Sequence, residues 1–304
     1  MTAQLIGNYL EYCRALKMSA QTISNYERGL RFFGAYLDQQ GKTLPLAQSA
    51  DVNGYIAAHP EWTAATTANR LSALRGFYKW MQIQRLLPDV DPMLEVRAPR
   101  QRLTRNKPSV SREEALLLTA ARHTRRDGIA FATDLRNRCL MSLIYDTGLR
   151  VSEAASLNLG TIRRMDPRRR EFIFTGKGGS EYFGYLSPDA YAMLSAYADA
   201  QADAPDSRAL FVNRGGERLS VRSIQKLIAA SGKRVLNRRL HPHMLRRGFG
   251  NAFYEASGHD IYATSQAMHH ASVTTTEEYL AVSPEHLKKV VDRMSAKPGG
   301  SRSM

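Results

Sequence analysis

The sequence predicts a mainly α-helical protein, with a helical N-terminal domain and a mixed, mostly helical second domain that contains a small β-hairpin. Three observations predict this fold class. The chain has 304 residues, 43% of them hydrophobic, which is enough for two domain cores. Apolar residues recur at helical spacing through most of the chain. One stretch, EFIFTGKGGSEYFGYLS, has the pattern of two strands around a glycine turn.

Residues 1–96 are predicted to form the helical first domain. Ser19 is a candidate N-cap for a helix that closes at Gly41. Two helical stripes are expected in the core; they comprise Ile23, Tyr26, Leu30, Phe33, Leu37, Leu71, Leu74, Phe77, Tyr78 and Met81. Pro88 and Pro92 stop the second helix. The opposite face of that helix is basic, which fits either a solvated surface or a contact with a polyanion; it carries Arg70, Arg75 and Lys79.

Residues 97–108 are predicted to be an extended basic linker. The segment has two prolines, no helical periodicity and no acidic residue. Its cations are Arg97, Arg100, Arg102, Arg105 and Lys107. Such a tether between two domains could follow a phosphate backbone.

The second domain is predicted to span residues 109–295. Ser111 and Glu114 form a capping box that opens it. A strongly apolar helix follows and breaks at Thr147-Gly148, and another helix begins near Ser152. The β-hairpin comes next, and from residue 189 onward the pattern is again mostly helical. The tail at 296–304 is low in apolar residues, so disorder is expected there.

Charge and composition narrow the class of function. The chain has 43 Lys and Arg against 28 Asp and Glu, a net charge of +15 with a pI near 10.0. This excess favours a polyanionic partner, most often nucleic acid, although a merely basic soluble protein is the alternative. The two cysteines have no metal-binding or disulfide spacing, which suits a reducing compartment. No signal peptide or membrane-length apolar run is present, so a soluble, cytoplasmic protein is expected.

Tyr279, in HHASVTTTEEYLAV, raises the possibility of a nucleophile acting on a phosphodiester. A phenol with a pKa near 10 needs help in losing its proton, and the negative charge that develops on phosphorus calls for fixed donors such as arginine. The leaving 5′ oxygen needs a general acid. Residues of these types are present at defined places; they are Arg150, Lys177, His243, Arg246 and His270. Taken singly, each of these residues is a weak signal for catalysis. A tyrosine in a helix, for example, usually packs in the core.

Together and in this order, these residues resemble the tyrosine recombinase (phage integrase) family, and the chain is closest in appearance to its compact Xer-type members. The resemblance covers nearly the whole chain and makes the first domain a core-binding, DNA-binding domain. It implies a catalytic set of Arg150, Lys177, His243, Arg246, His270 and Tyr279, with Glu153 bracing the first arginine. Family members cleave one strand through a 3′-phosphotyrosine and release a 5′ hydroxyl. Because that bond keeps the phosphodiester energy, no metal, ATP or other cofactor is expected.

The resemblance also implies partners. Double-stranded DNA carrying a target site is expected to bind the basic residues Arg70, Arg75, Lys79, Arg100, Arg102, Arg105 and Lys107. Strand exchange implies a homotetramer on two duplexes, with room for a second recombinase or an accessory factor. The stretch SPEHLKKVVDRM is predicted to form a helix with an apolar stripe, which either folds back on its own domain or docks on a neighbouring protomer.

The chain departs from the family pattern at two places. It has Met268-His269-His270 where the family usually has Leu-Gly-His, and the nine-residue spacing to Tyr279 favours His270 as the site histidine. Gly248 and Gly250 lower helix propensity by roughly 1 kcal/mol each without a functional reason in the sequence. Two other functions remain open: a type IB topoisomerase, and a DNA-binding accessory protein without catalysis.

Overall fold

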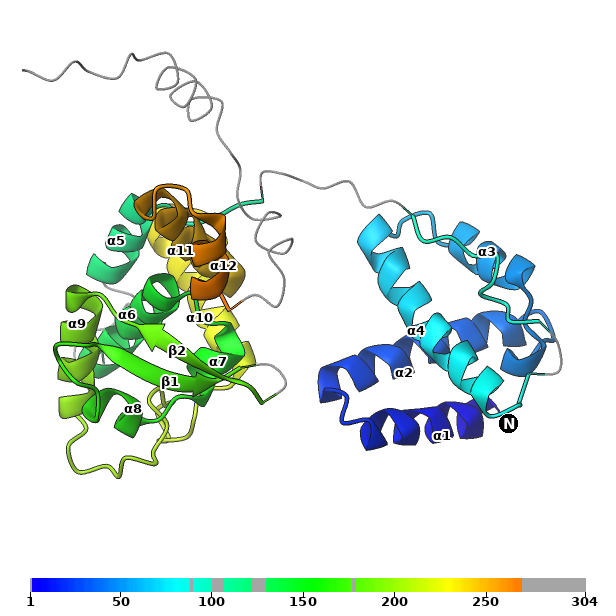
Figure 1. Ribbon diagram of the computed structural model, residues 1–304, viewed down its shortest axis with the longest axis horizontal. Helices are drawn as coiled ribbons and strands as arrows, with labels where there is room; N and C mark the ends of the chain where they lie inside the picture. The colour runs from blue at the N-terminus through cyan, green and yellow to red at the C-terminus, as the bar shows by residue number, and fades with distance from the viewer. Residues whose placement is uncertain (1, 88–89, 100–106, 122–129, 177–178, 270–304) are drawn as a thin grey trace, which may run out of the picture. The chain divides into compact units, whose positions relative to one another are not determined.

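The computed structural model describes residues 2–87, 90–99, 107–121, 130–176 and 179–269 (Figure 1). Within it the chain divides into two compact units, Met1–Leu103 and Thr104–Met304, so that the division lies inside the segment 97–108. The units are mostly helical, with a two-stranded sheet in the second, which confirms the predicted fold class. No helix among the described residues is long and apolar enough to cross a membrane.

The first unit packs its helices around a single apolar core. Its elements are α1 (Thr2–Ala15), α2 (Ala20–Asp38), a 3-10 turn at Leu44–Leu46, α3 (Ser49–Ala57) and α4 (Ala64–Ile83). Every residue of the predicted stripe on α4 is buried, as are Leu30, Phe33 and Leu37 of α2. Ile23 and Tyr26 pack at the core margin. The aromatic side chains of Tyr9, Phe77 and Trp80 contact one another and join α1 to α4.

The helix ends in this unit are set by local hydrogen bonds. Ser19 is confirmed as the N-cap of α2, since its hydroxyl accepts from the Thr22 amide at 3.1 Å. The helix ends at Asp38, three residues before the predicted end at Gly41. Gly41 lies in the following turn with φ of 68°, a conformation that glycine adopts without steric cost. Likewise α4 ends at Ile83, before the first of the two prolines.

The second unit is built around α6 (Ala130–Thr147). Helices α5 (Arg112–Ala120), α7 (Val151–Ser156), α9 (Pro188–Asp199) and α11 (Pro242–Ala256) all contact it. The described part of this unit also contains α8 (Leu159–Arg163), α10 (Val221–Leu236) and α12 (Ile261–Ala267). The capping box at Ser111 and Glu114 is confirmed at the start of α5. The break predicted at Thr147-Gly148 is also confirmed, because α6 ends at Thr147 and Gly148 has φ of 66°.

The predicted hairpin consists of β1 (Glu171–Thr175) and β2 (Glu181–Tyr185), which pair antiparallel. The inward face carries Phe172 and Phe174 into the core. Gly184 stands opposite Phe172, where a Cβ atom would come within 2.4 Å of the phenyl ring. The outward face exposes Ile173, Phe183 and Tyr185. Strand β1 contacts α8 and β2 contacts α6, so the hairpin is held against the helical body of the unit (Figure 1).

Candidate active site

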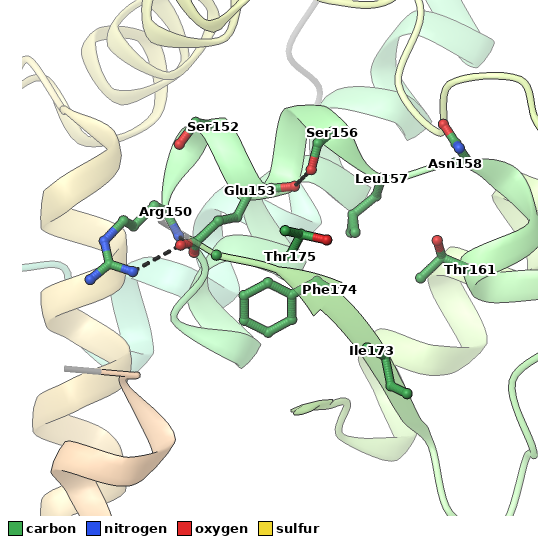
Figure 2. Close-up of a pocket in the computed structure, with 11 residues that line it drawn as sticks. Arg150, Ser152, Glu153, Ser156, Leu157, Asn158, Thr161, Ile173, Phe174 and Thr175 are labelled. Carbon is green, nitrogen blue, oxygen red and sulfur yellow. Dashed lines mark hydrogen bonds and ion pairs between the residues drawn. The ribbon is translucent and has the colours of Figure 1, made fainter. Parts of the chain in front are cut away.

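Four segments that are far apart in the sequence meet in the second unit: the loop before α7, the end of β1, the start of α11 and the end of α12. They bring together Arg150, Phe174, Arg246 and His269, which are joined by the contacts described below. A cleft of about 620 Å³ lies beside them, lined by α7 and β1 (Figure 2). The cleft and the convergent polar groups make this region the candidate active site.

Arg150 and Glu153 form an ion pair at the start of α7. The guanidinium Nη1 lies 2.8 Å from Glu153 Oε1, while the Arg150 backbone amide donates to Oε2 at 2.7 Å (Figure 2). Glu153 is buried at 4% exposure, whereas Arg150 keeps 31% of its side chain exposed. A buried carboxylate with both oxygens bonded holds the guanidinium in place. The exposed part of Arg150 can therefore bind an anion without a large rearrangement.

Arg246 is almost fully buried, at 2% exposure. Its Nη1 donates to the Gly148 carbonyl and its Nη2 to the Met268 carbonyl. Those carbonyls belong to the loop before Arg150 and to the C-cap of α12, so this side chain of α11 links three of the four segments.

His243 lies one turn before Arg246 on α11, at an exposed position. Partial desolvation, followed by the positive charges of Arg246 and Arg247, lowers the pKa of His243 below its ordinary value. Its imidazole is accordingly neutral at pH 7 and able to accept a proton. An arginine pair that attracts anionic oxygens, together with a neutral base beside it, suits chemistry on a phosphodiester.

His269 is a site residue that the sequence did not single out. Its carbonyl accepts from Arg150 Nη2 at 3.4 Å, and its ring packs against Phe174 and Tyr182 of the hairpin. Burial, followed by the charge of Arg246, lowers the pKa of His269 to about 4. The only signal in the sequence was the histidine in place of the family's usual glycine.

The structure also explains the glycines of α11. A Cβ atom on Gly248 would lie 2.2 Å from the Val110 carbonyl oxygen, and one on Gly250 would lie 2.6 Å from the Met268 sulfur. These glycines let α11 approach its neighbours closely, which sets the position of the helix that carries His243 and Arg246.

Several predicted site residues lie outside the described residues: Lys177, His270, Tyr279, Arg100, Arg102 and Arg105. The three predicted DNA contacts on α4 lie in the first unit. Arg75 donates to the Val96 carbonyl at 3.0 Å. The Arg70 guanidinium carbon lies 4.9 Å from the centroid of the Phe32 ring and 5.6 Å from that of the Trp62 ring. Lys79 is exposed. Lys107 is half-buried in the second unit. Within the described ranges, no group of three or more candidate ligands could hold a metal ion.

Comparison with known proteins identifies the family of this chain. Residues 110–286 match the phage integrase family, and residues 6–84 match the phage integrase N-terminal SAM-like domain. The chain therefore belongs to the phage integrase family of tyrosine recombinases. It is 33% identical to tyrosine recombinase XerC of Actinobacillus pleuropneumoniae serotype 7 over 93% of this chain and 91% of the relative. It is 31% identical to tyrosine recombinase XerD of Rhizobium meliloti over 96% and 94%.

Solved structures show the same fold. XerH recombinase in a post-cleavage complex with a palindromic difH substrate superposes with a TM-score of 0.74 at 19% identity, over 97% of this chain and 85% of that chain. XerH in a pre-cleavage complex with difH gives a TM-score of 0.72 at 20% identity, with the same coverage.

Proposed function

We propose that this chain recombines duplex DNA at specific sites by using Tyr279 as the nucleophile. The chain is a tyrosine recombinase, and DNA is its partner; the topoisomerase and accessory-protein alternatives are not favoured. The observation that carries the residue assignment is the meeting of Arg150, His243 and Arg246 at one site. Arg246 and Arg150 are assigned to the non-bridging oxygens of the scissile phosphate.

The proposed reaction is an exchange of one phosphodiester for another. The Tyr279 oxygen attacks phosphorus and forms a 3′-phosphotyrosyl bond, while the bond to the 5′ oxygen breaks. The phenol proton passes to a base, for which neutral His243 is suited, and Lys177 delivers a proton to the leaving 5′ oxygen. His270 is assigned as a further donor to the phosphate. In the second step a 5′ hydroxyl attacks the phosphotyrosine and restores the DNA backbone, so no external energy source is needed.

The proposal includes the assembly. Exchange between two duplexes needs four cleavage events, so we place a homotetramer on two sites, with a second recombinase or accessory factor as a possible addition. The two cysteines are buried and free, which fits action in the reducing cytoplasm.

The nucleophile is tested with Tyr279→Phe, which removes the attacking oxygen and keeps the ring. DNA trapped covalently on the wild-type protein in its host is first sequenced to identify the target site. The variant should bind that duplex normally and form no covalent adduct, as measured on a denaturing gel. An adduct that persists in the Phe variant would assign the nucleophile to another residue.

A further inference from the structure

His269 occupies an unusual backbone position next to the site. It follows α12 with φ of 51°, in the left-handed region that favours glycine. The residue is half-buried, and its ring packs against the hairpin. The ring centroid lies 5.0 Å from that of Phe174 and 5.0 Å from that of Tyr182, with interplanar angles of 72° and 49°. Both partners belong to the hairpin, so the histidine ring is a contact between α12 and the β-strands.

The contact continues from Tyr182 to the turn of the hairpin. Gly176 lies against the Tyr182 side chain, because a Cβ atom on this glycine would come within 2.5 Å of a ring carbon. Its amide donates to the Ser180 carbonyl at 2.8 Å, and its carbonyl accepts from Gly179 at 3.3 Å. Gly176 directly precedes Lys177 in the sequence. A displacement of the Tyr182 ring would therefore remove a contact that supports Gly176, the residue that precedes Lys177.

The same residue also contacts the arginine side of the site. The His269 carbonyl accepts from Arg150 Nη2 at 3.4 Å. The Glu153 carboxylate that braces Arg150 approaches the hairpin as well, because its Oε1 lies 3.7 Å from the position of a Cβ on Gly176. His269 thus touches the hairpin through its ring and the phosphate-binding arginine through its main chain. Its low pKa keeps the ring uncharged at pH 7, so the contact with the two aromatic rings is between neutral rings.

We propose that His269 is a positioning residue. Its ring fixes the position of the β1–β2 hairpin relative to Arg150, so that Lys177 reaches the leaving 5′ oxygen. This inference rests on the proposed function, in which Lys177 is the general acid. It predicts a specific defect: loss of the ring impairs protonation of the leaving group more than it impairs attack on phosphorus.

The test uses His269→Gly, since glycine suits the left-handed backbone and removes the ring. Cleavage is measured on a nicked duplex that carries the identified target site, with either oxygen or sulfur at the 5′ bridging position. Sulfur leaves without a proton. On the oxygen substrate the variant should be about 10- to 100-fold slower than wild type, the scale expected from misplacing a catalytic group by about 1 Å. On the sulfur substrate it should be close to wild type.

Two controls interpret the result. Lys177→Ala should lose about 10²- to 10⁴-fold on oxygen and recover on sulfur. Phe183→Ala removes an exposed ring from the outer face of the same strand, next to Tyr182, and should cleave both substrates at the wild-type rate. If Lys177→Ala is not rescued, both the acid assignment and this inference are wrong. If Lys177→Ala is rescued but His269→Gly is equally slow on both substrates, or as fast as wild type on oxygen, the inference alone is wrong.

A second perturbation approaches the same contact from the hairpin. Tyr182→Leu should reproduce the substrate-selective defect. The double variant with His269→Gly should be no slower than the slower single variant, because both substitutions remove the contact between His269 and Tyr182. His269→Phe keeps an aromatic ring and should retain most of the rate on oxygen. Multiplicative losses in the double variant, with both singles folded by circular dichroism, would contradict a shared role.

Discussion

At the scale of single residues, Arg246 combines burial with a charge. Its guanidinium is withdrawn from solvent and bound to the carbonyls of Gly148 and Met268. Burying a cation is costly unless acceptors compensate, and main-chain carbonyls at the end of a helix are suitable acceptors. The side chain therefore organises the loops around the site in addition to its assigned role at the phosphate.

The lowered histidine pKa values lead to a prediction of stability against pH. In the folded chain the pKa of His269 is about 4, whereas an unfolded histidine titrates near 6.5. Between these values the unfolded chain binds more protons than the folded chain, so this histidine makes the free energy of unfolding fall as pH decreases from about 6.5 towards 4. His269→Asn should show a smaller fall between pH 7 and pH 5 in urea denaturation. An identical fall in the variant and the wild type would rule out this linkage.

At the scale of elements, the packing of α11 decides where the H-x-x-R pair stands. Close contacts at Gly248 and Gly250 seat this helix against Val110, Tyr145 of α6 and Met268. The Val110 amide also donates to the Met244 carbonyl at 3.1 Å, which ties the start of the second unit to the same helix. Glycine costs helix propensity here, but it permits an approach that no side chain allows.

A glycine-to-alanine pair tests this packing. Gly248→Ala should lower the free energy of unfolding by about 1–3 kcal/mol, because the methyl group meets a main-chain carbonyl and the Tyr145 ring. Gly7→Ala in α1 is the matched control, since nothing lies within 4 Å of its Cβ position. It should raise stability by roughly 0.5–1 kcal/mol through helix propensity. Calorimetry measures both, and a stabilised Gly248→Ala would show that the approach is not required.

At the scale of the whole molecule, the charge of +15 bears on DNA affinity. Each phosphate neutralised by a cation adds about 0.9 to the slope of log affinity against log salt concentration. A triple variant in which glutamine replaces Arg102, Arg105 and Lys107 should have a slope that is smaller by roughly two to three. Its preference for the target site should be unchanged. Binding titrations from low to high salt provide the measurement. A slope that does not change would mean that the basic segment does not follow the backbone.

Assembly provides a second prediction at this scale. The stretch after Ser283 has an apolar stripe formed by Leu287, Val290, Val291 and Met294, and it lies outside the described residues. If it docks on a neighbouring protomer, truncation after Ser283 should leave half-site binding intact while cooperative binding and recombination fail. Gel-shift and recombination assays on one- and two-site DNA separate these steps. Recombination at the normal rate by the truncated protein would refute docking in trans.

The sequence by itself determined those features that depend on neighbours within a few residues. The N-cap at Ser19, the capping box at Ser111 and the break after Thr147 are decided by hydrogen bonds within one turn or by one glycine, so they could be predicted. The hairpin was predictable for the same reason, since a glycine-rich segment separates two short strand-like runs. A resemblance to the tyrosine recombinase family predicted the chemistry before any fold was known, and it rested on the order of Arg150, Lys177, His243, Arg246, His270 and Tyr279.

Only the tertiary structure decided which distant groups those residues meet. The stacking of Arg70 on Trp62, the burial of Arg246 and the orientation of the His269 ring towards Tyr182 all join segments whose separation in the chain says nothing about their distance in space. Gly248 is a further example, because a glycine disfavours helix formation when only its neighbours in the sequence are considered. It becomes a requirement once the Val110 carbonyl occupies the space that a side chain would fill. Close packing creates such constraints between elements, and no local pattern encodes them.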